Sequence, residues 1–209
     1  MTDVEVDGSG RQRRWQSPRV LYAIMLIGSG AGFVAALVLS IEAYDLAQNP
    51  AARFSCDINT AISCGTVAAS DQAHIFGFPN AFIGLATEPV VVTMAIVGLG
   101  RAALPRWVMA GLQIGATAGI GFSSWMLIQS VYVVHALCPW CLLVTTTTTV
   151  VFFAVTVLNI RTCALGLPAG IQRSLDWALD EGLDAYALLA WLLLVVAAVV
   201  TRFGGVLFD

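Results

Sequence analysis

The stretch Ala136–Ile160, ALCPWCLLVTTTTTVVFFAVTVLNI, decides the fold of this chain. Its 25 residues include no charged side chain. Roughly 20 apolar residues are enough for a helix to cross the hydrocarbon core of a bilayer. Two cysteines, Cys138 and Cys141, stand where the stretch begins. The stretch therefore predicts a membrane-spanning helix that carries a pair of thiols at one end.

Four other stretches are long and apolar enough to be considered as spans: Val20–Ile41, Ile75–Gly100, Trp107–Val134 and Ala185–Thr201. Hydrophobic residues make up 58% of the 209 residues, and only 11% are charged. A soluble domain does not need so apolar a composition to close its core. We therefore expect an all-α integral membrane protein, a bundle of four core transmembrane helices with a fifth transmembrane helix at the carboxyl end.

The connections between these spans are too short to form a second domain with its own core. We expect one bundle, 20–160, with its outer loop at 42–74. The remaining parts are an amino-terminal segment, a connection on the same side of the membrane, and the fifth helix with a short tail: 1–19, 161–184 and 185–209.

The positive charges predict how the bundle is oriented. The chain has ten basic residues, all of them arginine, and basic residues in short flanks prefer the cytoplasmic side. Arg53 and Arg202 fall on one side, and eight arginines fall on the other: Arg11, Arg13, Arg14, Arg19, Arg101, Arg106, Arg161 and Arg173. The amino terminus is therefore expected in the cytoplasm, with the carboxyl terminus and both cysteine pairs outside. A net charge of -3 gives no basic stripe for nucleic acid.

The motif Cys138-Pro139-Trp140-Cys141 is the most specific chemical signal in the sequence. Proline is favoured at the first position of a helix, so Cys138 is expected at or near the N-cap, with Cys141 one turn further in. Free N–H groups and the positive end of the helix dipole stabilise a thiolate there. Such a thiol can attack or leave, as disulfide exchange requires.

The loop pair, Cys56 and Cys64, has the spacing C-x7-C. Eight residues along a helix rise about 12 Å, whereas a disulfide requires Cα atoms roughly 4.4–6.8 Å apart. Either the segment turns back on itself, or one cysteine reaches across to Cys138 while the other stays free. A relay needs both states to be accessible. The alternative is a permanent staple that holds an extracellular loop.

These motifs together resemble the vitamin K epoxide reductase family. The resemblance covers about four spans, and three strings appear in the family's order: CDINTAISC at 56–64, FGFPNAFIG at 76–84 and CPWC at 138–141. Bacterial proteins of this kind are similar in task to the four-helix DsbB type, which reoxidises a DsbA-like disulfide donor. The resemblance implies a thiol oxidase of the bacterial cytoplasmic membrane that passes two electrons to a quinone.

The family pattern also implies a role for each matching residue. Cys141 would be the thiol nearest the quinone, and Cys138 its partner, attacked from the loop. Cys64 would be the attacking cysteine, and Cys56 the contact for a thioredoxin-fold protein outside the membrane. Asn80 would hydrogen-bond the quinone oxygen. The acceptor could be menaquinone, ubiquinone or vitamin K, and no metal is expected.

Two features depart from the family pattern. Eukaryotic members carry a tyrosine four residues after the last cysteine of the motif, and this chain has Thr145. Epoxide turnover and coumarin affinity are therefore not carried over. Many bacterial relatives have a fused thioredoxin domain, and this chain stops about eight residues after the fifth span. We therefore expect the DsbA-like partner to be a separate chain.

Further candidates come from the spans themselves. Met126, Ser130 and Val134 recur every four residues, so they share one face of a regular helix and could form a quinone wall. Ordinary packing is the alternative for all three. Glu88 is the only charge inside any span, and it could donate a proton to the quinone or be protonated and bonded locally. Cys163 falls on the inner side and is interpreted as a bystander.

Two other functions use the same cysteines. A carrier that delivers reducing equivalents outward would need a thiol pair within reach of the cytoplasm, and Cys163 is alone there. A metal-handling protein could use Cys138 and Cys141 as soft ligands, but this function leaves the loop pair unexplained. A bridge between Cys64 and Cys138 in a Cys141→Ser or Cys141→Ala variant would distinguish the relay from a metal site and from a permanent staple.

Overall fold

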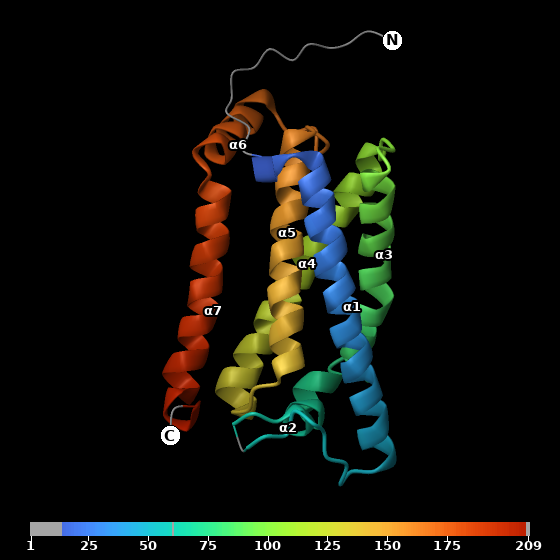
Figure 1. Ribbon diagram of the computed structural model, residues 1–209, viewed down its shortest axis with the longest axis vertical. Helices are drawn as coiled ribbons and strands as arrows, with labels where there is room; N and C mark the ends of the chain where they lie inside the picture. The colour runs from blue at the N-terminus through green and yellow to red at the C-terminus, as the bar shows by residue number, and fades with distance from the viewer. Residues whose placement is uncertain (1–13, 60, 208–209) are drawn as a thin grey trace.

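The structure is a computed structural model that describes residues 14–59 and 61–207, except for the side chains of 205–207. The elements in this part of the chain are helices, and five of them are long and apolar enough to cross a membrane (Figure 1). The all-α membrane fold expected from the sequence is confirmed. These five are α1 (Pro18–Gln48), α3 (Ala81–Leu99), α4 (Arg106–Gln129) with its π-helical continuation η3 (Ser130–Val134), α5 (Pro139–Arg161) and α7 (Leu183–Leu207). The shorter elements are η1 (Arg14–Gln16), α2 (Cys64–Ala68), η2 (Asp71–His74) and α6 (Ala169–Glu181).

Successive long helices run in opposite directions, so each end of the bundle collects its own set of connections (Figure 1). α1 packs along α3 and α5, and α4 packs along α5. α7 stands at the edge of the bundle, where it contacts α5 and η3. We call the end with α2 the four-cysteine end, because it holds Cys56, Cys64, Cys138 and Cys141. The opposite end holds α6. Arg11 and Arg13, which were used to predict the orientation, lie outside the described residues.

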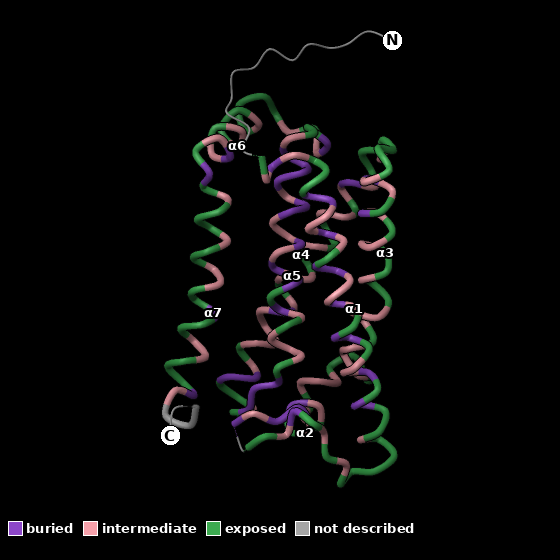
Figure 2. Tube along the Cα trace, viewed as in Figure 1, coloured by how far each residue is buried: buried purple, intermediate pink, exposed green. Residues whose placement is uncertain are grey.

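The outer surface of the long helices is apolar, as a bilayer requires. Ile27 on α1 is 73% exposed, and Ile114 on α4 is 71% exposed. On α7 the exposed and partly exposed positions follow one another along the helix, and the buried side chains in its described part are Val195 and Phe203 (Figure 2). Side chains that water would disfavour are stable against lipid tails, so these surfaces identify the faces that meet the membrane.

The interior of the bundle lies between α1 and α5. Leu21 and Met25 of α1 are buried in the same cluster as Val155 and Leu158 of α5. A Cβ atom on Gly28 would lie 2.9 Å from a methyl group of Val151, so this glycine lets the two helices approach closely. Because lipid supplies no hydrophobic force between helices, such close packing provides much of their attraction.

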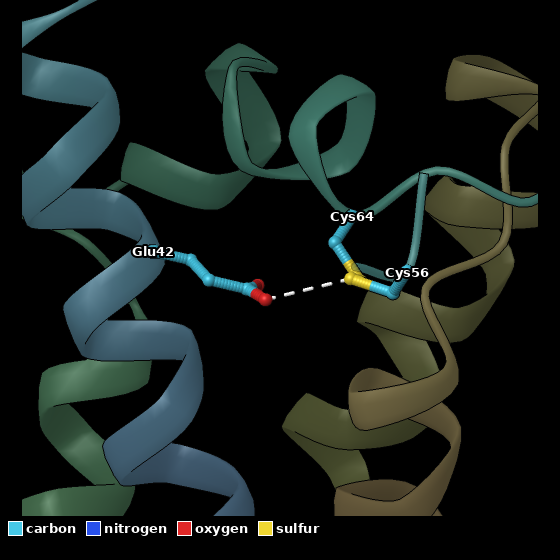
Figure 3. A group of neighbouring side chains, drawn as sticks. All are labelled: Glu42, Cys56 and Cys64. Atoms are coloured by element: carbon cyan, nitrogen blue, oxygen red, sulfur yellow. Dashed lines mark hydrogen bonds between the residues drawn. A yellow bond between two sulfur atoms is a disulfide. The ribbon is translucent and has the colours of Figure 1, made fainter. Parts of the chain in front are cut away.

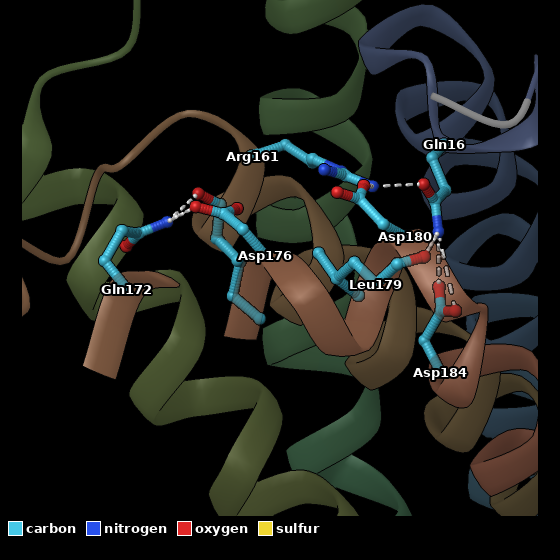
Figure 4. A network of polar contacts seen from close by, with 8 residues as sticks. Gln16, Arg161, Gln172, Asp176, Leu179, Asp180 and Asp184 are labelled. Carbon is cyan, nitrogen blue, oxygen red and sulfur yellow. Dashed lines mark hydrogen bonds and ion pairs between the residues drawn. The ribbon is translucent and has the colours of Figure 1, made fainter. Parts of the chain in front are cut away.

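The opposite end is closed by α6 and a set of polar contacts around Gln16 (Figure 4). The Gln16 side chain is fully buried and donates to the carbonyl oxygen of Leu179 at 2.9 Å. Arg161, at the end of α5, donates to Gln16 at 2.6 Å and pairs with Asp180 of α6 at 2.8 Å. The segment 161–184 therefore contains a helix, which the sequence analysis treated only as a connection. At 13 residues, α6 is too short to span a bilayer.

Two of the helix boundaries that differ from those predicted shape the four-cysteine end. α1 continues past Ile41 to Gln48, because residues 42–48 contain neither glycine nor proline. Its 31 residues give a length of about 46 Å, which exceeds the roughly 30 Å of hydrocarbon. α3 begins at Ala81 instead of Ile75, because Gly77 turns the chain with a positive φ of 79° and Pro79 precedes the helix.

Candidate functional site

The loop between α1 and α2 folds back on itself and brings its two cysteines together. Cys56 and Cys64 form a disulfide, with Cα atoms 5.7 Å apart. The Asn59 side-chain oxygen accepts hydrogen bonds from the backbone N–H groups of Ala61 at 2.9 Å and Ile62 at 2.8 Å. This local turn is typical of asparagine, whose side chain replaces a backbone acceptor. Of the two arrangements that the C-x7-C spacing left open, the structure has the one in which the segment turns back.

Asp57 holds the folded loop in place. Its carboxylate accepts from the backbone N–H of Phe54 at 2.8 Å, from the Ser63 hydroxyl at 2.8 Å and from the N–H of Gly65 at 2.9 Å. Partial desolvation opposes ionisation, but the hydrogen bonds from Phe54, Gly65, Ser63 and Cys64 outweigh it and lower the pKa of Asp57 below its ordinary value. Asp57 therefore connects the residues on both sides of the disulfide.

A short backbone bridge connects the loop to the segment before the Cys-Pro-Trp-Cys motif. Ile62 pairs with Leu137 in an isolated parallel bridge. The Leu137 N–H donates to the carbonyl of Ala61 at 2.7 Å, and the Ser63 N–H donates to that of Leu137 at 3.0 Å. The residues that follow on each segment are Cys64 and Cys138, so the bridge sets one cysteine of each pair beside the other.

Cys64 and Cys138 meet in the buried interior of this end. Their Sγ atoms are 3.3 Å apart, and the residues are 0% and 1% exposed. Cys64 is in the disulfide with Cys56, whereas Cys138 is a free thiol. A thiolate must reach a disulfide sulfur directly to exchange with it. The structure therefore places an attacking atom and its target in contact.

The Cys-Pro-Trp-Cys motif begins α5 as the sequence predicted. Cys138 is the N-cap, Pro139 occupies the first helical position, and the Cys138 sulfur accepts from the N–H of Cys141 at 3.4 Å. Hydrogen bonds from the Cys141 thiol and from this N–H lower the pKa of Cys138, although burial opposes them. Cys138 is therefore the thiol of this pair that ionises more readily than an ordinary cysteine.

A cavity of about 880 Å³ lies between α1, α3, α4 and α5 and reaches the Cys-Pro-Trp-Cys motif. Its walls are mainly aliphatic, and both Cys138 and Cys141 belong to its lining. Gly111, Gly115 and Gly119 of α4 also line it, and they leave room there because they carry no side chain. This volume and apolar lining suit a ring-shaped, lipid-soluble molecule held by a few polar groups.

Asn80 stands immediately before α3, at the wall of this cavity. Its side-chain nitrogen donates to the carbonyl of Gln72 at 2.7 Å, and a second, weaker contact runs to the Met126 sulfur at 3.5 Å. The side-chain oxygen of Asn80 is buried and has no hydrogen-bond partner. An amide that is anchored by one N–H keeps the other N–H and its oxygen for a ligand. The orphaned oxygen can accept from the O–H of a quinol, and the weakly used N–H can donate to an oxygen of a quinone.

The other predicted quinone contacts are Met126, Ser130 and Val134, and the π-helical segment η3 places Val134 on a different face from the other two. Met126 and Ser130 line the cavity, but Val134 does not. Val134 instead packs against the cysteine cluster that includes Cys138. A π-helical turn inserts an extra residue, so positions four apart no longer share one face. Val134 therefore does not share the face of Met126 and Ser130, and its contact with a quinone stays a prediction. The Ser130 hydroxyl already donates to the carbonyl of Ala136.

Glu88 lies deeper in the same cavity, on α3. A Cβ atom on Gly32 of α1 would be 2.8 Å from its Oε1, so the glycine makes room for the carboxyl group. Cys163 lies at the opposite end and is exposed. The five cysteines are thus distributed as the sequence predicted, with four at one end and one at the other.

Glu42 lies beside the disulfide, although no sequence pattern pointed to this residue (Figure 3). Glu42 is in α1, and the predicted first span ended one residue before it, so it was counted as a loop residue. Among the described residues, Glu42, Cys56 and Cys64 are a group whose possible metal-ligating atoms all lie within 4.8 Å of one another. In this state the two sulfurs are bonded to each other, so they are not thiolate ligands. The Cys-Pro-Trp-Cys cysteines do not belong to this group.

The fold and the site together define a multi-pass membrane protein with two adjacent cysteine couples beside an apolar cavity, an arrangement suited to thiol–disulfide redox chemistry. The family model of the vitamin K epoxide reductase family matches residues 23–156. This match covers more than half of the chain, and the chain belongs to that family. No curated protein matches it. The family carries out disulfide and quinone redox chemistry in membranes, and the cysteine pairs for it are present here.

Proposed function

We propose that this chain is a thiol oxidase that reoxidises a DsbA-like thioredoxin-fold protein and delivers two electrons to a membrane quinone. The contact that carries the proposal is the 3.3 Å distance between the Sγ atoms of Cys64 and Cys138, because it joins the two cysteine pairs. The arginine distribution supports a cytoplasmic amino terminus in a bacterial inner membrane. The four-cysteine end then faces the outside, where the partner would be a separate chain.

The proposed cycle begins with both pairs as disulfides. A thiolate of the partner attacks Cys56 and releases Cys64 as a thiolate. Cys64 then attacks Cys138, forms a Cys64–Cys138 bond and releases Cys141 as a thiolate. The second thiol of the partner frees Cys56, and the partner leaves with a new disulfide. Two electrons have then moved from the partner to the protein.

Cys56 next attacks Cys64 and displaces Cys138. This step restores the loop disulfide and leaves Cys138 and Cys141 as a dithiol, the state that the structure describes. The lowered pKa of Cys138 favours it as the leaving group, because a more acidic thiol leaves faster. A quinone held in the cavity would supply the two-electron acceptor that lets these two cysteines return to a disulfide.

Several residues of the cavity are suited to hold that acceptor. Asn80 is the first candidate, because its orphaned oxygen and its weakly used N–H lie at the cavity wall. Met126 and Ser130 would form part of the same wall. Glu88 is a candidate proton donor, because reduction of a quinone to a quinol consumes two protons along with the two electrons.

The test is quinone-dependent oxidation of a reduced, purified DsbA-like protein by the full-length chain in lipid nanodiscs. Loss of partner thiols and formation of quinol are measured together, and we expect one quinol for each disulfide made. A Cys56→Ser variant should lose the activity, and a Cys163→Ser variant should retain it. Partner oxidation that proceeds equally without quinone would contradict the proposal, as would activity that survives Cys56→Ser.

A further inference from the structure

Glu42 places a carboxyl group directly against the loop disulfide. The side chain extends from α1 toward the two sulfurs, as Figure 3 shows, and the residue is only 6% exposed. One carboxyl oxygen is 3.4 Å from the Sγ of Cys56, and the other is buried without a hydrogen-bond partner. A buried carboxyl group that lacks full hydrogen bonding is costly. The fold therefore keeps Glu42 at this position at the expense of stability.

The chemistry of this contact depends on the redox state of Cys56. A disulfide sulfur carries no hydrogen, so in the oxidised loop the hydrogen bond requires a protonated Glu42 that donates to sulfur. When Cys56 is a thiol, the same oxygen can accept its proton. The other titratable groups near Glu42 are Asp57 and Cys64 on the loop and Cys138 and Cys141 on α5. None of these groups is a cation, so none provides a fixed countercharge for a permanently ionised Glu42.

We propose that Glu42 is a catalytic residue that exchanges one proton with the Sγ of Cys56 as the loop disulfide opens and closes. This inference rests on the proposed function, because it assigns a proton carrier to two of its steps. The second thiolate of the partner attacks the partner sulfur that is bonded to Cys56 and forms the partner's disulfide. The partner–Cys56 bond breaks, and protonated Glu42 gives its proton to the Cys56 sulfur. Glu42 is then a carboxylate that faces a thiol.

The second step returns the proton. Cys56 gives its proton to the Glu42 carboxylate and forms a bond with the sulfur of Cys64. The Cys64–Cys138 bond breaks, and its electron pair leaves on Cys138, at the amino-terminal end of α5. One disulfide replaces another, so no oxidant is consumed, and Glu42 ends the cycle protonated as it began. The 3.4 Å contact is short enough for transfer to Cys56 without movement of the backbone.

A test that omits both quinone and partner isolates this step. The full-length chain is oxidised with diamide, desalted, and mixed with one equivalent of dithiothreitol, which takes the place of the partner dithiol. Acid quenching, alkylation and peptide mapping then follow the Cys64–Cys138 bond over time. In the wild type this bond should form and decay as Cys56–Cys64 is restored. In Glu42→Gln at pH 6.5, decay should be about 100-fold slower, the lower range of general acid–base effects.

The pH profile separates proton transfer from a structural role. The defect of Glu42→Gln should shrink as the pH approaches the ordinary thiol pKa of about 8.5, because Cys56 then ionises without help. Glu42→Asp should recover part of the rate, and it still tests the proposal if the glutamine variant folds poorly. Asp45→Asn removes an exposed carboxylate from the same helix, and in this variant the Cys64–Cys138 bond should decay at the wild-type rate.

The possible failures are distinguishable. If the Cys64–Cys138 bond decays in Glu42→Gln at the wild-type rate at pH 6.5, the role of Glu42 is overturned and the relay is left intact. A defect of equal size at every pH would also overturn it, because a packing defect does not follow the ionisation of Cys56. If the wild type never forms the Cys64–Cys138 bond, then the relay of the proposed function fails, and the role of Glu42 fails with it.

Discussion

The two ends of the bundle are both closed by contacts between side chains, but the kinds of bond differ. At the opposite end, Gln16, Arg161 and Asp180 connect η1, α5 and α6 by hydrogen bonds and one ion pair (Figure 4). At the four-cysteine end, the corresponding connection between the loop and α5 runs through Cys64 and Cys138. The hydrogen bonds at the opposite end re-form with the same partners whenever they break. The cysteine sulfurs at the four-cysteine end can exchange partners.

This difference explains how a small bundle can hold a reactive centre. The segments around the sulfurs are fixed by bonds that do not exchange, namely the Asp57 carboxylate and the Ile62–Leu137 bridge. In the proposed cycle only the sulfurs change partners, so the chemistry would require small movements of side chains and no refolding of the loop. Disturbing the two ends should therefore have very different consequences.

The largest effect is expected from Cys141→Ser. Cys138 then has no neighbour on α5 with which to form a disulfide, and its thiolate can attack the Cys64 sulfur 3.3 Å away, which breaks the Cys56–Cys64 bond and releases Cys56 as a thiolate. We expect the variant to lose quinone-dependent turnover entirely and, when an alkylating agent caps the freed Cys56 thiol, to accumulate a Cys64–Cys138 bond. Peptide mapping under non-reducing conditions detects that bond. Cys163→Ser is the matched control, because it removes a cysteine from the opposite end and should leave the pattern unchanged.

A Cys141→Ser protein in which Cys56–Cys64 stays intact and no crosslink forms would contradict this interpretation. It would mean that the contact between Cys64 and Cys138 is only packing. A metal site would give a different result, since the variant would lose bound metal and show no crosslink. The experiment thus separates exchangeable from permanent bonds at this end.

A smaller effect is expected from Asp57→Ala, which removes a permanent support of the same end. The change deletes three acceptor contacts, to Phe54, Ser63 and Gly65, and hydrogen bonds to a charged group contribute about 1.5–3 kcal/mol each at most. Water replaces part of the contribution of these hydrogen bonds, because the loop is half-exposed. We expect a loss of about 2 kcal/mol in the free energy of local opening, or about thirtyfold faster hydrogen exchange at Gly65.

Acid should have the same effect on the wild type. The folded-state pKa of Asp57 is lowered from 3.8, so its stabilising contribution is complete above the unfolded value and is lost as the pH falls through the lower folded value. Exchange at Gly65, corrected for its intrinsic pH dependence, should therefore rise below about pH 4 in the wild type. Asp57→Ala should show no such rise. If the two proteins respond alike to acid, Asp57 is not the support of the loop.

The sequence predicted much of the fold and the four sulfurs, but not the groups that position them. Long apolar runs identify spans, and Cys138 before Pro139 identifies a helix start, because both signals are local. Glu42 and Asp57 gave no local signal. Their roles depend on α1 continuing past Ile41 and on the loop folding back, which bring together residues up to 14 positions apart. The separation of Val134 from the face of Met126 and Ser130 was not predicted, because a π-helical turn has no reliable pattern in sequence.

The smallest effect is expected at the opposite end, from Asp180→Asn. The side chains of Arg161 and Asp180 are 14% and 34% exposed, and ion pairs that reach solvent contribute about 0–1 kcal/mol. Arg161 also keeps its hydrogen bond to Gln16. Thermal unfolding in nanodiscs should therefore show a loss of at most about 1 kcal/mol, with unchanged quinone-dependent turnover and unchanged exchange between Cys64 and Cys138. A clear fall in either activity would show that the two ends are coupled through α5, because α5 carries both Cys138 and Arg161 at its ends. The bonds of the opposite end would then be part of the redox machinery rather than a fixed closure.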